Sequence, residues 1–205
     1  MAKKKNDEPK VYKEHPSVDQ RITDTLRENY MPYAMSVTVS RAIPEIDGFK
    51  PSHRKLLYTM YKMGLLNGNR TKSANIVGST MKLNPHGDAA IYETMVRLTR
   101  GNEALLMPFV DSKGNFGKVY SRDMAYAAPR YTEAKLDAFC AELFRDIDTD
   151  AVDFVDNYDG TMKEPTLLPT TFPNILVSAN TGIAVGMASN FCGFNLEEVC
   201  RTTIE

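Results

Sequence analysis

The sequence predicts an α+β fold, and two patterns along its 205 residues indicate it. Helical patterns cover residues 18–40, 51–63, 73–82, 88–100 and a segment after residue 131. Beyond Asp150, short apolar runs alternate with turn residues, which is typical of short strands. A chain of this length buries one good core, or one domain and part of a second.

The composition is that of an ordinary soluble globular protein. Its residues are 42% hydrophobic and 25% charged, and no apolar run approaches the ~20 residues of a membrane span. Met1–Lys13 is rich in lysine and lacks an apolar stretch, so we expect a flexible arm rather than a secretory signal. Cys140, Cys192 and Cys200 are widely spaced and form no CxxC pair, which argues against disulfides or a zinc site and favours a reducing cytoplasm.

Charge is unevenly distributed, although the net charge is only −1. Residues 50–100 contain nine Lys or Arg against two Asp or Glu, whereas residues 132–165 contain three against ten. A basic block of this kind is where a polyanion would bind, and a merely solvated surface is the alternative.

The first predicted helix begins near residues 17–19 and ends before a turn at Ile43–Gly48. Pro51 fits the first turn of a second helix, because its missing N–H costs nothing there. Apolar residues at i, i+4 and i+7 form the predicted buried stripe of this helix: Leu56, Met60 and Met63. Three basic residues share a different face: Lys50, His53 and Arg54.

Two further predicted helices, over residues 73–82 and 88–100, are separated by a sharp break at Leu83–Gly87. Two helices across a tight turn inside the basic block match a helix-turn-helix, in which the second helix is the reader. An ordinary αα corner is the alternative. Residues 111–120 contain two glycines and fall where a winged helix has its wing. We therefore predict a winged-helix domain that binds DNA.

The clearest helix is predicted after Tyr131, from an apolar stripe at Leu136, Phe139, Cys140, Leu143, Phe144 and Ile147. Further along, residues 153–158 and 165–170 are predicted as short strands, and the apolar runs 175–177 and 183–185 flank a polar loop. Asn195 opens a helix that is still running at Glu205, so we expect the sequence to be part of a longer protein.

Tyr131 is the main candidate for chemistry. It follows Ala127–Pro129 at the start of the predicted helix, so its hydroxyl would lie near a helix N-terminus, which favours anions. The neighbouring Arg130 can form charge-assisted, bidentate hydrogen bonds with a phosphate. A tyrosine hydroxyl is protonated at neutral pH, so it needs a base or a metal-polarised phosphate to act as a nucleophile. A tyrosine packed at a helix start beside a solvated arginine is the alternative.

Five motifs occur in the order Ser40–Pro44 with Asp47–Arg54, Asn84–Asp88, Gly114–Gly117, Arg130–Leu136 and Gly182–Ala188. They are distributed along the chain from residue 40 to residue 188. They resemble the motifs of the A subunits of DNA gyrase and bacterial topoisomerase IV, the DNA-cleaving subunits of type IIA topoisomerases, and this sequence would be their N-terminal breakage-reunion part.

The resemblance implies that Tyr131 attacks a DNA backbone phosphate, which forms a covalent phosphotyrosine and frees a 3′-hydroxyl. Arg130 would stabilise the charge of the transition state. Family positions that hold the DNA backbone match Arg41, Lys50, His53, Arg54 and His86. Ile183 matches an isoleucine that wedges between base pairs, where an apolar side chain unstacks and bends the duplex. The alternative is that Ile183 is a buried residue of a strand.

The same resemblance implies the partners and cofactors. The protein would act on double-stranded DNA as a homodimer, in an A2B2 complex with a B subunit that binds ATP and Mg²⁺. Its function would be that of an ATP-dependent type II topoisomerase, which supercoils or decatenates DNA. We expect no metal ligand in this chain, no membrane partner and a cytoplasmic location.

Ala89 and Glu93 lie four residues apart on the predicted reader helix and match the positions that anchor quinolone drugs through a water–metal bridge. Ala89 stands where Ser or Thr is usual and offers no acceptor, so we expect a weak quinolone response. Asn84 replaces a second histidine found in many members, and Pro129 replaces a methionine common in gyrases. These departures leave gyrase and topoisomerase IV undistinguished.

The expected domains are an arm and helix over residues 1–35, a winged-helix cleavage domain over 36–150, and the beginning of a mixed tower domain over 151–205. Two other interpretations stay open: a winged-helix DNA-binding regulator without catalysis, and a piece of a larger enzyme that is inert alone. Tyr120 and Tyr126 are rival nucleophiles close to Tyr131 in sequence.

Overall fold

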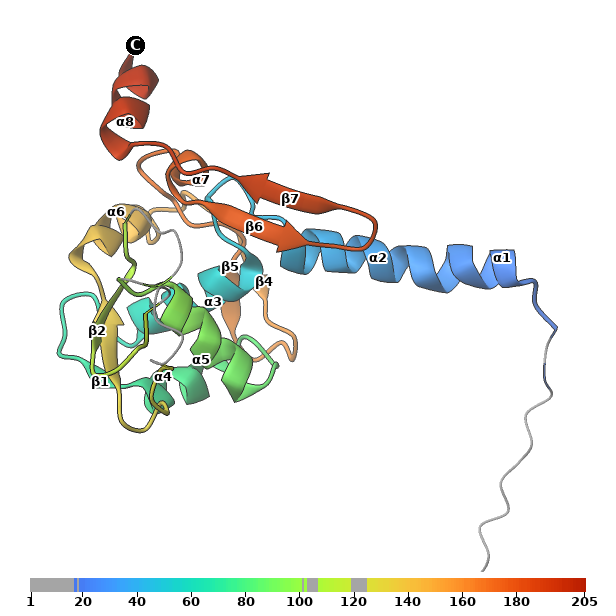
Figure 1. The fold of residues 1–205 in the computed structure, drawn as a ribbon, viewed down its shortest axis with the longest axis horizontal. Helices are drawn as coiled ribbons and strands as arrows, with labels where there is room; N and C mark the ends of the chain where they lie inside the picture. Colours follow the sequence, from blue (N-terminus) through green and yellow to red (C-terminus); the bar gives the residue numbers. More distant parts are fainter. Residues whose placement is uncertain (1–16, 18, 101, 103–106, 119–124) are drawn as a thin grey trace, which may run out of the picture. The chain divides into compact units, whose positions relative to one another are not determined.

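The computed structural model describes residues 17, 19–100, 102, 107–118 and 125–205 (Figure 1). The chain divides into two compact units, one ending at Tyr33 and the other running from Ala34 to Glu205. The predicted N-terminal arm and Tyr120 lie outside the described residues. Helical backbone runs from Ile22 to Ala42 without a break, through α1 (Ile22–Thr25), η1 (Leu26–Tyr30), α2 (Met31–Val37) and η2 (Thr38–Ala42). This confirms the first predicted helix.

Three helices of the second unit pack together in its core: α3 (Pro51–Lys62), α4 (Ser73–Thr80) and α5 (Asp88–Arg97). Pro51 occupies the first turn of α3, as predicted. Leu56 and Met60 of α3 are fully buried, and so is Met95 of α5. The three helices pack on one another around this apolar cluster (Figure 1). The burial of these apolar stripes stabilises the helix arrangement.

A small antiparallel sheet completes the core, with strand order β1-β3-β2. It consists of β1 (Thr71–Lys72), β2 (Val110–Lys113) and β3 (Glu133–Leu136). Ala134 of β3 lies opposite Thr71 on one side and Ser112 on the other. The middle strand therefore joins the start of α4 to the segment that follows α5.

The prediction of a helix directly after Tyr131 is wrong, because residues 133–136 form the central strand β3. Its side chains alternate: Ala134 and Leu136 are fully buried, whereas Glu133 and Lys135 are partly exposed. Helix begins only after Asp137, whose side chain accepts a hydrogen bond from Phe139 N at 3.1 Å. The turns η3 (Ala138–Cys140) and α6 (Ala141–Phe144) then carry the rest of the apolar stripe, and Cys140 is buried as expected.

The last part of the chain contains two strand pairs and two helices. The antiparallel pairs are β4 (Phe154–Asp156) with β5 (Lys163–Pro165), and β6 (Asn180–Ile183) with β7 (Ala188–Phe191). The sequence predicts a strand over residues 165–170, but strand β5 ends at Pro165. Helix α7 (Asn174–Val177) precedes β6, and α8 (Leu196–Ile204) begins at Asn195, whose side chain caps Glu197 N at 2.9 Å. Among the described helices, none is long and apolar enough to cross a membrane.

Candidate nucleic-acid interface

Tyr131 is an exposed residue two positions before β3, in the connection between β2 and β3. Its side chain is 65% exposed, and the Arg130 guanidinium lies 4.7 Å from the centre of its ring. The loop closes through a hydrogen bond from Tyr131 N to Ala128 O at 2.9 Å. Because a strand follows, Tyr131 is not at the N-terminus of its own helix, and the predicted helix dipole does not act on it. The phenol and the guanidinium are nevertheless presented to solvent side by side.

Buried hydrogen bonds behind Tyr131 fix the position of this loop. Thr132 is fully buried, and its hydroxyl donates to Ser73 Oγ at 2.8 Å and lies 2.9 Å from the hydroxyl of Tyr92. Tyr92 OH also donates to Ala127 O at 2.8 Å, and burial raises the pKa of Tyr92, which keeps it a neutral donor. The first backbone amides of α4 bind the loop as well, from Ser73 N to Thr132 O and from Ala74 N to Pro129 O.

This buried network was not predicted from the sequence. The sequence places Ser73 only at a helix start, and 59 residues separate it from Thr132. The one signal in the sequence is the threonine that follows Tyr131, because a small polar residue next to an exposed aromatic residue can turn inward. Nothing in the sequence indicates its partners.

Arg41 and His86 line one groove, which encloses about 680 Å³. Lys55 also lines this groove, although no sequence motif identified it. Its ammonium group pairs with Glu164 at 3.1 Å and donates to Leu83 O at 3.0 Å. The groove is otherwise lined by small and polar residues: Ser36, Ser40, Pro51, Ser52, Asn84, Gly87, Ala90 and Thr94. Three positively ionisable groups thus converge on one hollow, which suits a polyanion.

Lys50 and His53 line a second, smaller pocket together with Arg97 of α5 and Asn180 and Thr181 of β6. The pKa of His53 is lowered to about 4, first because burial disfavours the charged imidazole and then because Lys50, Arg97 and Arg54 are nearby. His53 is therefore neutral at pH 7. Lys50 Nζ donates to Thr181 O at 2.7 Å, so this lysine also contacts the backbone of β6.

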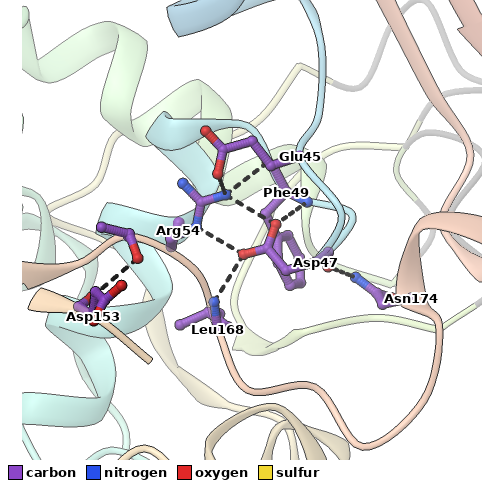
Figure 2. Close-up of polar contacts among 8 residues, drawn as sticks. Glu45, Asp47, Phe49, Arg54, Asp153, Leu168 and Asn174 are labelled. Atoms are coloured by element: carbon purple, nitrogen blue, oxygen red, sulfur yellow. Dashed lines mark hydrogen bonds and ion pairs between the residues drawn. The ribbon is translucent and has the colours of Figure 1, made fainter. Parts of the chain in front are cut away.

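Arg54, a predicted DNA contact, is buried, and it lies among Glu45, Asp47 and Phe49 of the turn before α3 (Figure 2). Its guanidinium pairs with Asp47 at 2.7 Å and Glu45 at 3.1 Å and donates to Phe49 O. Helical spacing placed Arg54 on one face with Lys50 and His53. The two carboxylates of the turn before α3 bind the guanidinium. We therefore assign Arg54 to the structure of the turn.

Ile183 is the last residue of β6 and is 87% exposed, so the alternative of a buried strand residue is wrong. The β6–β7 hairpin carries it, and the turn beyond it is closed by Ala184 N donating to Met187 O at 2.9 Å. Met187, on the same turn, is 54% exposed. Large apolar side chains at a hairpin end are unfavourable in water, so a partner surface for them is expected.

The other predicted positions lie on α5 or outside both cavities. Ala89 and Glu93 are exposed on α5, and Glu93 pairs with Arg97 at 2.8 Å. Neither Arg130 nor Tyr131 lines the groove or the pocket described above. Within the part of the chain that the structure describes, no three His, Cys, Asp or Glu residues cluster as metal ligands would.

The geometry defines an exposed tyrosine–arginine pair together with basic hollows on a helical α+β unit. The family model that describes the A subunit of DNA gyrase/topoisomerase IV matches residues 41–205. The chain therefore belongs to the family of DNA gyrase/topoisomerase IV A subunits.

Individual relatives agree with this assignment. The DNA gyrase A subunit from Staphylococcus epidermidis (strain ATCC 12228 / FDA PCI 1200) is 50% identical over 184 residues. That from Staphylococcus aureus (strain NCTC 8325 / PS 47) is 48% identical over 184 residues. Each match covers 88% of this chain but 20% of the relative, so the chain spans about a fifth of the length of these proteins.

Proposed function

We propose that this chain contains the DNA-cleaving site of the A subunit in a type II topoisomerase, with Tyr131 as the nucleophile. The phenolic oxygen would attack a backbone phosphorus and form a 5′-phosphotyrosine bond, while the P–O bond to the neighbouring 3′ oxygen breaks and that oxygen leaves as a hydroxyl. The reverse attack by the 3′-hydroxyl restores the strand without outside energy. The observation that carries the proposal is the exposed phenol of Tyr131 beside Arg130, on a loop that the buried hydrogen bond of Thr132 to Ser73 holds in place.

Arg130 would stabilise the charge that develops on the phosphoryl oxygens, because a guanidinium provides charge-assisted hydrogen bonds in a planar fork. Its contact with the Tyr131 ring keeps the two groups together before DNA arrives. Phosphoryl transfer depends mainly on positioning and charge stabilisation, and this pair contributes to both.

The element order supports a winged-helix domain as the DNA-binding part. Helix α3, strand β1, helices α4 and α5, and strands β2 and β3 follow one another as helix, strand, helix, helix, strand, strand. In this assignment α4 and α5 would form the helix-turn-helix, α5 would be the reader, and residues 111–120 would be the wing. The domain would extend over residues 36–150, and residues 151–205 would begin the tower domain.

The DNA-backbone contacts proposed are Arg41, Lys50, His53 and His86, to which the groove adds Lys55. Cationic and hydrogen-bonding side chains around hollows bind phosphates without reading sequence. Ile183 would insert between base pairs, and its exposure at a hairpin end supports that role. The pocket and the groove would then hold the duplex while the wedge bends it.

The remaining parts of the activity would belong to the assembly. We propose that two A subunits and two B subunits act on double-stranded DNA in the cytoplasm, with Mg²⁺ and ATP bound by the B subunit. The metal would polarise the attacked phosphate, and ATP would drive strand passage. Whether the parent enzyme supercoils or decatenates DNA would depend on parts outside these 205 residues.

The test is covalent capture of cleaved DNA by the full-length protein combined with its B subunit and Mg²⁺. The wild-type protein should give a covalent DNA adduct that survives denaturation, and Tyr131→Phe should give none. Tyr126→Phe is the matched control, because Tyr126 is also exposed and lies five residues away. An adduct that persists in Tyr131→Phe, or is lost in Tyr126→Phe, contradicts the assignment. Binding without any adduct would favour a non-catalytic winged-helix regulator.

The quinolone site gives a second test of the same assignment. Ala89 offers no acceptor to a water–metal bridge, so wild-type protein should show weak drug-stabilised cleavage. In Ala89→Ser, with a hydroxyl one turn from Glu93, cleavage stabilised by a quinolone should rise severalfold in a gel assay. No rise in Ala89→Ser would contradict the assignment of these two positions.

A further inference from the structure

The β6–β7 hairpin, which carries Ile183, lies beside the segment that leads into α3 (Figure 1). Asn174, in the short helix α7 just before the hairpin, is fully buried. Its Nδ2 donates to Asp47 O at 2.8 Å, and its Oδ1 accepts a hydrogen bond from Ser178 Oγ at 2.9 Å. One side chain thus connects the turn to the residue two positions before β6.

On the other side of this contact, the turn is held by hydrogen bonds to the side chain of Asp47 (Figure 2). The Asp47 carboxylate accepts hydrogen bonds from Arg54 at 2.7 and 2.9 Å, from Phe49 N at 3.1 Å and from Leu168 N at 2.9 Å. Asp47 and Arg54 are both buried. A buried, fully hydrogen-bonded ion pair holds its surroundings in one arrangement, because any movement leaves a charge unpaired.

Close packing adds further points of attachment. A side-chain carbon at Gly48 would lie 2.8 Å from Ile175 N, and one at Gly182 would collide with Ala42 O. Lys50 Nζ donates to Thr181 O, within β6 itself. The residue 42–50 segment therefore contacts β6 at Thr181 and Gly182, while Ile183, directly after Gly182, projects into solvent.

We infer that Asn174 is a positioning residue that fixes the β6–β7 hairpin to the phosphate-binding start of α3, and so sets how far Ile183 enters the duplex. The inference rests on the proposed function. Unstacking a base step costs free energy, so an inserted side chain must be held in place against the DNA. A hairpin that could move relative to the segment before α3 would be displaced by the DNA, and the duplex would bend less. Asn174 carries no charge, so it would act without contributing to phosphate affinity.

The test is DNA bending by the full-length protein in complex with its B subunit, using energy transfer between dyes at the two ends of a duplex of about 30 base pairs. Asn174→Ala should lower the bending-dependent energy transfer to the level of Ile183→Ala. The dependence of binding on salt should be unchanged, because no charge is removed.

Asn157→Ala is the matched control for loss of stability. Asn157 is also a buried asparagine, and it donates to Lys82 O at 2.9 Å and accepts from Met162 N at 3.1 Å, in the β4–β5 connection. This variant should melt at a lower temperature, as Asn174→Ala should, but bend DNA as the wild-type protein does. If Asn174→Ala bends DNA as the wild-type protein does, or if both asparagine variants lose bending equally, the positioning role of Asn174 is wrong. The proposed wedge role of Ile183 is unaffected by either result. Wild-type bending by Ile183→Ala overturns the wedge role on which the inference rests.

Discussion

At the scale of single residues, the site depends on the directions in which three consecutive side chains point. Arg130 and Tyr131 face solvent, and Thr132 faces the core. The inward threonine holds the outward pair in place, because its hydroxyl contacts Ser73 and Tyr92, which come from α4 and α5. Positioning of a nucleophile is sensitive to shifts of about 1 Å, so these contacts should matter for the rate of cleavage.

Thr132→Val keeps the volume of this side chain but removes its hydroxyl. Ser73 then loses its hydrogen-bond donor and Tyr92 loses a partner, which should cost about 1–3 kcal/mol of unfolding free energy. We expect DNA cleavage to slow by roughly tenfold or more, with DNA affinity unchanged. Thr80→Val is the control, since Thr80 is also fully buried and donates only to Ile76 O in its own helix. Equal cleavage rates in the two variants would refute the positioning role of Thr132.

His53 gives a prediction on pH. Its pKa in the folded protein is about 4, against an unfolded value near 6.5, because of burial and the neighbouring Lys50, Arg97 and Arg54, which outweigh Asp47. Between those values the unfolded chain binds a proton that the folded chain does not, so stability falls as the pH drops from 6.5 to 4. The loss should be on the order of 1–3 kcal/mol and should be reduced in His53→Gln, measured by urea unfolding at several pH values. Identical profiles of stability against pH for the wild-type protein and His53→Gln would contradict the lowered pKa of His53.

At the scale of the elements, the turn before α3 determines which basic residues remain available. Glu45 and Asp47 bind Arg54, so the face predicted to carry three DNA contacts retains Lys50 and His53. Arg54→Met would leave a buried carboxylate without its cation, which should destabilise the fold by about 3–5 kcal/mol in urea unfolding. The salt slope of DNA binding should remain that of the wild-type protein under native conditions. In Arg41→Met, by contrast, the slope should fall by about 1, because Arg41 is exposed and lines the groove.

Sequence patterns predicted the helices well because their apolar spacing is regular and tertiary packing reinforces it, as in α3 and α5. They failed at residues 133–136, where Leu136 fits both the end of a two-residue alternation and the start of a helical stripe. Pairing with β1 and β2 decides in favour of strand, and such pairing is not local. For the same reason Ser73, Tyr92 and Asn174 could not be predicted as partners of site residues.

At the scale of the whole molecule, the second unit combines three kinds of surface. These are the Tyr131–Arg130 loop, the basic groove and pocket beside α3 and α5, and the hairpin that carries Ile183. Neither Tyr131 nor Arg130 lines the groove or the pocket. We therefore expect duplex binding, bending and cleavage to be separable by mutation. Ile183→Ala should reduce bending, whereas Tyr131→Phe should bind and bend DNA but leave it intact.

The most direct test of the central claim is to identify which DNA end becomes linked to which residue. Trypsin should release the linked nucleotide on the peptide Tyr131–Lys135, which mass spectrometry can identify. This peptide should carry the 5′ phosphate, and the free DNA end should be a 3′-hydroxyl. A link through a 3′ phosphate, or on a peptide containing Tyr126 instead, would contradict it.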